Sequence, residues 1–347
     1  MFRSAAAPFL SGTPSGANRG WFARLAKLTP IQSAPPQAPV LHAMCGHVLH
    51  TTFPMTGLPI CAETAGPLGS ILVRPGETPQ RLAAGVQLES GVDVSDREVL
   101  IWVRDGGRIL VRDGREIIVD LQAGVGRNLQ PFILGTGLAA ACLQKGLLSL
   151  HASAVGRAGE SIAFAGASGA GKSTMAAAMI ARGYDHLSDD LSVLRLPGKG
   201  RAELYSSVPL VKLWPDSASA VGLDDRDAKS ELSWHAKLMF DMPAAAASSS
   251  TRLAAIYFLE REDRADIVIE RLVGHYALSA LAREIYRRAW LTPMGRLEEV
   301  LQQVAQLSRR TPCFRVGRPH RFDQLHQVAQ TIADHHASLT AVQGSAA

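Results

Sequence analysis

The sequence contains little cysteine and no long apolar run. Its 347 residues include four cysteines, and no two of them form a CxxC pair. This scatter excludes a disulfide framework or a zinc site and predicts core thiols in a reducing compartment, so we expect a cytoplasmic protein. No apolar run approaches the roughly 18 residues that cross a bilayer, so we expect no membrane partner. The four cysteines are Cys45, Cys61, Cys142 and Cys313.

Acidic residues are absent from the first part of the chain. The first is Glu63, and the four basic residues before it supply most of the net charge of +5. Because the rest of the chain is nearly balanced, a general basic face for nucleic acid is not expected. The sequence leaves a monomer and a homo-oligomer both open. The early basic residues are Arg3, Arg19, Arg24 and Lys27.

Composition divides the chain into four parts. Hydrophobic residues make up 47% and charged residues 19%, which is normal for a protein with a good core. Residues 1–40 are rich in Ala, Pro, Ser and Gly without a sustained period, which predicts a disordered leader or a true start at Met44. We expect a β-rich domain over 45–125, a larger α/β domain over 126–338 and a disordered tail over 339–347.

The β-rich part shows short strands separated by turn signals. Asp105-Gly106 and Asp113-Gly114 stand between apolar runs, which is typical of hairpin turns. The pattern predicts a small antiparallel β domain that packs on something larger. The predicted strands are 71–73, 99–103, 109–111 and 117–119.

The remainder of the chain alternates helical and β-type patterns. Residues 129–144 have helical spacing and Gly146 follows them as a helix stop. The Ala/Ser-rich stretch 241–251 predicts a mobile loop. Further predicted elements are helices at 276–290, 296–307 and 322–335 and a strand at 313–316.

A glycine-rich loop carries the strongest signal. Residues 166–173 fit GxxxxGK[ST] without a mismatch, between an apolar strand at 161–165 and an Ala/Met-rich helix. In such a loop the glycines let backbone N–H groups turn toward phosphate oxygens, Lys172 reaches the β- and γ-phosphates, and Ser173 offers its hydroxyl to Mg²⁺. The sequence therefore predicts binding of ATP or GTP with Mg²⁺. The candidate nucleotide-binding residues are Gly166, Ala167, Ser168, Gly169, Ala170, Gly171, Lys172, Ser173 and Thr174.

Two adjacent carboxylates follow the loop helix. Asp189 and Asp190 come after a short β-type run, where one carboxylate can hold Mg²⁺ while the other accepts the proton of an attacking hydroxyl. An exposed acidic turn is the alternative interpretation. His151 precedes the loop strand, and taken alone it is more typical of a hydrogen-bonded core residue than of a catalytic one.

These segments together resemble the kinase domain of the HPr kinase/phosphorylase family. The family has an S-x-H segment, the loop, and an RG-H-x-L-x-x-DD segment in this order, and the segments 149–151, 166–173 and 182–190 of this chain follow one another in the same order and at similar spacing. The resemblance implies an α/β kinase core with a mixed, curved sheet. It further implies that Asp190 is the base and Asp189 the Mg²⁺ partner, with the reverse assignment open, and that His151 belongs to the active site.

The later part of that family's pattern fits less well. Glu203 matches an acidic residue on the metal side, but Tyr205 stands where the family has an arginine, and no HPr-docking segment is recognisable. The chain is therefore not expected to be the regulatory HPr enzyme itself, and phosphorylase activity is not expected. A closer resemblance, over about 45–335, is to HPr-kinase-like proteins encoded with lasso-peptide precursors. It rests on the segments 112–120, 144–155, 208–215 and 311–316.

The sequence thus predicts a kinase that transfers the γ-phosphate to a serine hydroxyl of a peptide or small protein. The catalytic candidates are His151, Lys172 and Asp190, and the metal candidates are Ser173, Asp189 and Glu203. A nucleotide-dependent binding module or NTPase and a kinase of a small-molecule hydroxyl are the alternatives, because acceptor sites are not shared as the phosphate machinery is. Three other basic residues are expected to be solvated surface charges, with contact to a phosphate or a peptide carboxylate as the alternative: Lys212, Lys237 and Arg252.

Overall fold

The structure is a computed structural model that describes most of the chain after residue 38. Residues 1–38, which make up most of the predicted leader, and the centre of the predicted loop at 241–251 lie outside the described residues, as does Asp105 of the first predicted turn. The described part is 39–344 except 54, 56–57, 90, 105, 122–128, 225–227, 229, 233–236, 243–249 and 320.

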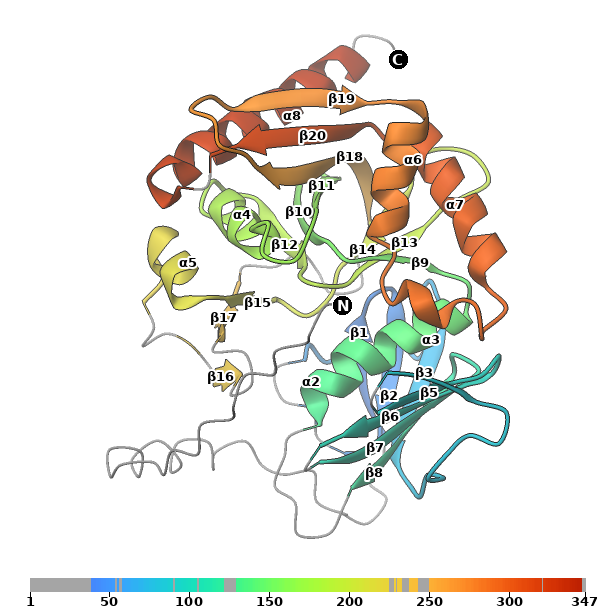
Figure 1. The fold of residues 1–347 in the computed structure, drawn as a ribbon. Helices are drawn as coiled ribbons and strands as arrows, with labels where there is room; N and C mark the ends of the chain where they lie inside the picture. The colour runs from blue at the N-terminus through green and yellow to red at the C-terminus, as the bar shows by residue number, and fades with distance from the viewer. Residues whose placement is uncertain are drawn as a thin grey trace, which may run out of the picture.

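The first part of the described chain forms an eight-stranded sheet, drawn in blue to teal in Figure 1. Its order is β1-β2-β3-β8-β7-β6-β5-β4. Consecutive strands β4 to β8 pair antiparallel, as the turn signals predict. The strands are β1 (Val40–Met44), β2 (His47–Thr51), β3 (Ser70–Pro75), β4 (Val86–Glu89), β5 (Val92–Val94), β6 (Glu98–Val103), β7 (Gly107–Arg112) and β8 (Glu116–Leu121).

The prediction of a purely antiparallel sheet was wrong at one place. Strand β3 lies between β2 and β8 and pairs with both in parallel. Parallel neighbours need a long connection, and the chain between β3 and β8 supplies it by making the whole meander first. The order of short strands along the sequence does not reveal that β8 returns to pair with β3.

The turn between β7 and β8 shows how the sequence sets this sheet's register. Asp113 and Gly114 have φ angles of 53° and 64°, and the N–H of Arg115 donates to the carbonyl of Arg112. Asp and Gly tolerate this left-handed conformation, which makes the turn twist in the sense that a hairpin requires. The prediction of a turn at these two residues is confirmed.

The segment after the first sheet is helical, as predicted, and contains a π-helical turn at Ile133–Gly137. It comprises α2 (Gln130–Phe132), this turn and α3 (Leu138–Gln144), and Gly146 ends it with φ of 70°. Every residue of α3 is buried. In Figure 1 α3, in green, lies between the first sheet and β9 (Leu148–Leu150).

The second sheet is mixed and has nine strands. Its continuous path is β12-β10-β11-β18-β14-β13-β9, with β20 on the far part of β18 and β19 beside β20. The pairs β11–β18 and β18–β20 are parallel and the others antiparallel, which establishes a mixed α/β fold. The further strands are β10 (Ser153–Arg157), β11 (Glu160–Ala165), β12 (Asp185–Ser188), β13 (Ser192–Arg195), β14 (Glu203–Tyr205), β18 (Ser250–Arg261), β19 (Val268–Leu272) and β20 (Cys313–Arg318).

Two helices pack on one another and on this sheet. Helix α4 (Lys172–Ile180) buries Met175, Ala176 and Met179 in an apolar cluster that also includes Ile332 of α8 (Leu325–Gly344). Small alanines let α4 approach the strands closely, while the methionines fill the remaining gaps. This packing fixes the start of α4 relative to β11, where the glycine-rich loop lies.

A small third sheet lies beside α4 and is drawn in yellow in Figure 1. It consists of β15 (Leu210–Leu213), β17 (Lys237–Asp241) and β16 (Ser230–Leu232) in that order, all antiparallel. Val211 and Phe240 pack with Ala177 of α4 in one cluster, together with Ala218 of α5 (Pro215–Ala220). The third sheet is therefore held in place by its packing against α4.

The first and second sheets share one hydrophobic core. A single cluster of buried side chains includes Ile71 and Ile117 of the first sheet and Phe258 and Trp290 of the later chain. The N–H of Cys45 also donates to the carbonyl of Ser206 at 2.8 Å. The predicted boundary at 125/126 falls among residues outside the described part, and no gap in the core marks the two sides.

Two predicted helices have different ends. Helix α6 runs over Gly274–Arg283, well short of residue 290, because Ile285 forms a β-bridge with Leu150 and the N–H of Tyr286 donates to Ser149. Helix α7 (Leu297–Arg310) follows as predicted. Helix α8 continues to Gly344, so residues 339–344 are helical, contrary to the predicted tail.

All four cysteines are free thiols. Three are buried as predicted, and Cys61 is only partly buried. Burial raises the pKa of the Cys142 thiol to about 12, which keeps it protonated and unreactive. Within the described part of the chain, no helix combines the length and the apolar character needed to cross a membrane.

Candidate phosphoryl-transfer site

The glycine-rich loop at 166–173 connects the end of β11 to the start of α4. Gly166, Gly169 and Gly171 have φ angles of 128°, 81° and 92°, which side chains rarely adopt. A Cβ atom at Gly166 would lie 2.7 Å from the carbonyl oxygen of Leu259. The glycines are therefore required by the backbone path itself.

The lysine of the loop folds back over it. Lys172 is 7% exposed, and its Nζ donates to the carbonyls of Gly166 at 2.7 Å and Ala167 at 3.3 Å. Burial lowers the pKa of Lys172, and the charges of Glu284 and Asp190 partly oppose this effect. The ammonium group thus lies across the mouth of the loop.

The other predicted loop residues divide into a crest and a base. Ala167 and Ser168 are exposed at the crest, whereas Ala170 is buried and Thr174 is half-buried in the first turn of α4. Within the described part of the chain, no hydrogen bond is donated by the N–H groups of Gly171, Lys172 or Ser173. Free N–H groups at a helix start are the donors that bind phosphate oxygens.

Asp189 is the most highly connected side chain of the site. Its Oδ1 accepts from the hydroxyls of Ser153 and Ser173, both at 2.7 Å, and its Oδ2 accepts from the backbone N–H of Lys212 at 3.0 Å. Burial raises the pKa of Asp189, and the negative charge of Asp190 raises it further. A positive ion beside this carboxylate would offset both effects.

Asp190 is held in an unusual backbone conformation. Its φ is 66°, and its Oδ2 lies 3.0 Å from Nζ of Lys212. Burial acts to raise the pKa of Asp190, but Lys212, Lys237 and His151 outweigh it, so the pKa lies below its ordinary value. About a third of the Asp190 side chain is exposed, at 33%. An ionised and accessible carboxylate results.

The His151 side chain contacts the backbone of Asp190. Its Nδ1 lies 3.1 Å from the carbonyl oxygen of Asp190, and its own N–H donates to the carbonyl of Glu284 at 2.7 Å. The His151 ring lies 6.1 Å from that of Tyr286. The structure therefore brings His151 to the site, where it supports the left-handed backbone at Asp190.

The metal role predicted for Glu203 is not compatible with the sheet register. Glu203 aligns with Arg252 on β18, whereas the residue before the loop aligns with Phe258, six positions and about 20 Å farther along the strand. Its carboxylate bonds instead to Arg195 at 2.7 Å and to the hydroxyl of Tyr205 at 3.1 Å. Glu203 thus lies too far from the loop to bind a metal ion held there.

The remaining oxygen ligands fit Mg²⁺. Ser173 and Asp189 already place a hydroxyl and a carboxylate oxygen 2.7 Å apart at the loop. Magnesium is typically bound through one or two carboxylates, waters and substrate phosphates. Among the described residues no cluster of three metal-ligating side chains occurs, and this mode of binding does not need one.

Three basic residues near the loop were not among the predicted site residues, although contact with a phosphate or a carboxylate was the alternative for Lys212. Lys212, expected to be a solvated charge, pairs with Asp190. Arg261 donates to the carbonyl of Gly169, and Arg318 donates to that of Ala170 at 2.6 Å. No local sequence signal marks the two arginines, because strand pairing over long separations brings them to the loop.

Comparison with known proteins adds little to this geometry. No family model matches the chain, and no curated protein matches it either. Among solved structures, the Hpr(Ser) kinase/phosphatase from Coxiella burnetii is similar over 57% of this chain and 95% of its own. The identity is 11% and the TM-score 0.33, which is too weak to show a shared fold or activity.

Proposed function

We propose that this chain is a kinase that transfers the γ-phosphate of ATP or GTP to a serine hydroxyl of a peptide or small protein. The observation that carries the proposal is the hydrogen bond between Ser173 and Asp189 at the start of α4, with Asp190 next to them. The hydroxyl and the first carboxylate suit a metal-bound nucleotide, and the second carboxylate suits an acceptor hydroxyl.

The loop would bind the β- and γ-phosphates. Its free N–H groups and the positive end of α4 favour anionic oxygens, and Lys172 would exchange the carbonyls of Gly166 and Ala167 for phosphate. Ser173 and Asp189 would hold Mg²⁺, which supplies charge neutralisation at the phosphate oxygens when bound.

Asp190 would orient and deprotonate the acceptor. The serine oxygen forms a bond to the γ-phosphorus, the bond from that phosphorus to the β–γ bridging oxygen breaks, and the nucleoside diphosphate leaves with the electron pair. The hydroxyl proton passes to Asp190. Lys212 holds the carboxylate of Asp190 and His151 holds its backbone, so the base is positioned before the acceptor arrives.

The surface beside Asp190 supports a peptide acceptor. The charge of Lys237 is close enough to lower the pKa of Asp190, and its ammonium lies 5.8 Å from the ring centre of Trp214. Trp214 is 49% exposed. An exposed indole and a cation suit a peptide end with a carboxylate, which agrees with the C-terminal serine of a lasso-peptide precursor as acceptor.

Transfer of ³²P tests the proposal. Wild-type chain with Mg²⁺ and γ-labelled ATP or GTP is offered peptides with C-terminal or internal serine, beside Lys172→Ala and Asp190→Asn. Label on a serine that both variants lose would establish the kinase. Free labelled phosphate with no labelled peptide would favour an NTPase or nucleotide-dependent binding module, and label on a metabolite would indicate a small-molecule kinase.

A further inference from the structure

Two arginines lie side by side at the base of the glycine-rich loop. Arg261 ends β18 and Arg318 ends β20, and the parallel register places them directly opposite each other. Both donate to successive carbonyls of the loop, Arg261 to Gly169 and Arg318 to Ala170. The two strand ends are therefore joined to the loop through guanidinium groups.

None of the carboxylates that the structure describes neutralises this pair. Like charges directly opposite on neighbouring strands destabilise a sheet, and burying a charge without a partner is costly. Glu262, the adjacent carboxylate, pairs instead with Arg264 and Arg315. In the part of the chain that the structure describes, no ion pair involves Arg261 or Arg318.

Arg318 is buried, so the lack of a carboxylate partner among the described residues is more costly for its charge. The residue is 6% exposed, and its Nε is buried with no hydrogen-bond partner among the described residues. Its Nη1 donates only to the carbonyl of Pro319, at 3.4 Å. Burial lowers the pKa of Arg318, and the positive charge of Arg261 lowers it further. An anion at the loop would relieve this repulsion.

The bond to Ala170 also sets the direction of a donor. The C=O and N–H of one peptide unit point in opposite directions, so fixing the carbonyl of Ala170 on Arg318 turns the N–H of Gly171 the other way. A Cβ at Gly171 would lie 2.7 Å from Nη2 of Arg318, which shows how closely the guanidinium approaches. A side chain at this position would force the guanidinium to shift.

We propose that Arg261 and Arg318 are positioning residues that hold the loop in its phosphate-binding form and whose two positive charges favour a nucleoside triphosphate over ligands with fewer phosphates. The inference rests on the proposed function, since it takes the loop as the nucleotide site. It adds a source of phosphate-number specificity that lies outside the loop itself.

Calorimetric titration with ATP, ADP and AMP in Mg²⁺ tests this role. The proteins are the wild type, Arg318→Met, Arg318→Lys, Arg261→Met and, as a matched control, Arg108→Met, whose arginine pairs with Asp120 on the first sheet. Because a charged hydrogen bond is lost, Arg318→Met should weaken the binding of ATP about 10- to 100-fold. The binding of ADP should weaken less, and that of AMP hardly at all. Arg318→Lys should restore part of the ATP affinity.

The pattern across ligands separates the outcomes. An equal loss for all three nucleotides, or no loss in either arginine variant, would overturn the inference. Arg261 is exposed, so Arg261→Met keeps the test informative if Arg318→Met does not fold by circular dichroism. A wild type that binds none of the three would instead refute the proposed function.

Discussion

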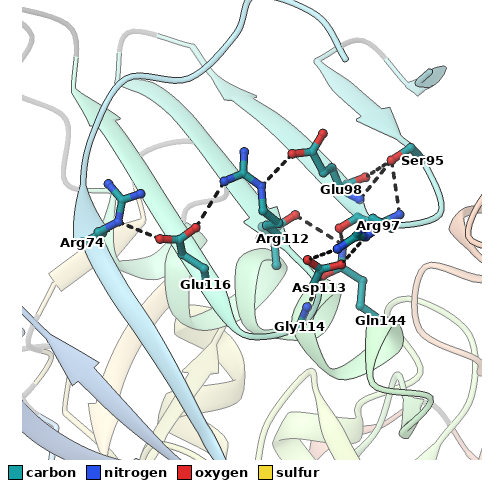
Figure 2. A network of polar contacts seen from close by, with 10 residues as sticks. Arg74, Ser95, Arg97, Glu98, Arg112, Asp113, Gly114, Glu116 and Gln144 are labelled. Atoms are coloured by element: carbon teal, nitrogen blue, oxygen red, sulfur yellow. Dashed lines mark hydrogen bonds and ion pairs between the residues drawn. The ribbon is translucent and has the colours of Figure 1, made fainter. Parts of the chain in front are cut away.

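Arginine is used in opposite ways in the first sheet and at the glycine-rich loop. Figure 2 shows the first sheet, where Arg74 and Arg112 both bond to Glu116 and Arg97 forms two bonds of 2.7 and 2.9 Å with Asp113. At the loop, Arg261 and Arg318 bond to backbone carbonyls and have no carboxylate partner among the described residues.

The difference separates stabilising charge from charge kept for a ligand. Ion pairs such as those in Figure 2 are partly exposed, and each is typically worth no more than about 1 kcal/mol. Their charges cancel within the protein, so nothing remains for an anion. At the loop the cancellation is incomplete, and we infer that a phosphate chain completes it.

The largest expected effect tests the carboxylate pair at the loop. Asp190→Asn removes the base but leaves the contacts of Asp189 with Ser153 and Ser173, so transfer should fall by roughly 10²- to 10⁴-fold while ATP binding changes little. Asp189→Asn should instead weaken Mg²⁺-dependent ATP binding as well. Phosphotransfer assays and calorimetry measure both. If the two variants exchange these behaviours, the roles are reversed.

A smaller effect is expected when the ion pair beside the base is broken. Lys212→Met removes the cation that lowers the pKa of Asp190, while the backbone N–H that bonds to Asp189 remains. Transfer should fall about 10- to 100-fold from the loss of this charged bond. Because the pKa of Asp190 rises, the acid limb of the kcat/KM profile should move to higher pH. An unmoved limb would show that Asp190 is not the titrating base.

Matched glycine substitutions compare the two regions at positions where the backbone has positive φ. Gly171 and Gly114 both have positive φ, and at each a Cβ would meet a neighbour at 2.7 Å, so Gly171→Ala and Gly114→Ala should each destabilise by roughly 1–3 kcal/mol. Only Gly171→Ala should also lose ATP affinity. Urea unfolding and calorimetry check this. A loss of ATP affinity in Gly114→Ala would mean that strain anywhere disturbs the site.

The local parts of this site could be predicted from sequence. The spacing of glycines and Lys172 specifies the loop, because the same residues that turn the backbone are those that the motif uses to bind phosphate. Asp189 and Asp190 follow the loop helix by one short strand, so chain order alone brings them near Ser173. The different surroundings of the two carboxylates, with Asp189 enclosed and Asp190 accessible, could be seen only in the structure.

The non-local parts could not be predicted. Arg261 and Arg318 come to the loop only because β18 and β20 pair in one particular register. The metal role predicted for Glu203 does not hold for the converse reason. Its place in the linear pattern fits a metal ligand, but its register puts it at the other end of β18. Pairing between distant strands depends on the whole sheet, which no short motif records.

The smallest expected effect concerns an ion pair of the first sheet. Asp120 accepts from Arg108 at 2.8 Å and from the backbone and hydroxyl of Thr78, and these bonds outweigh burial and lower the pKa of Asp120. With side chains 22% and 19% exposed, the pair should contribute about 1 kcal/mol, so Arg108→Met should reduce the unfolding free energy by that amount and leave ATP binding unchanged.

The pH dependence of this loss follows from the lowered pKa. The contribution of the pair is fully present above the ordinary carboxyl value of 3.8 and is lost as pH falls through the folded-state pKa of Asp120. The stability gap between wild type and Arg108→Met should therefore be constant from about pH 7 to about pH 5 and narrow toward about pH 3. Urea titrations along this series measure it. A gap that persists in acid would mean that the Arg108 side chain stabilises the sheet through packing, and that charge contributes little there.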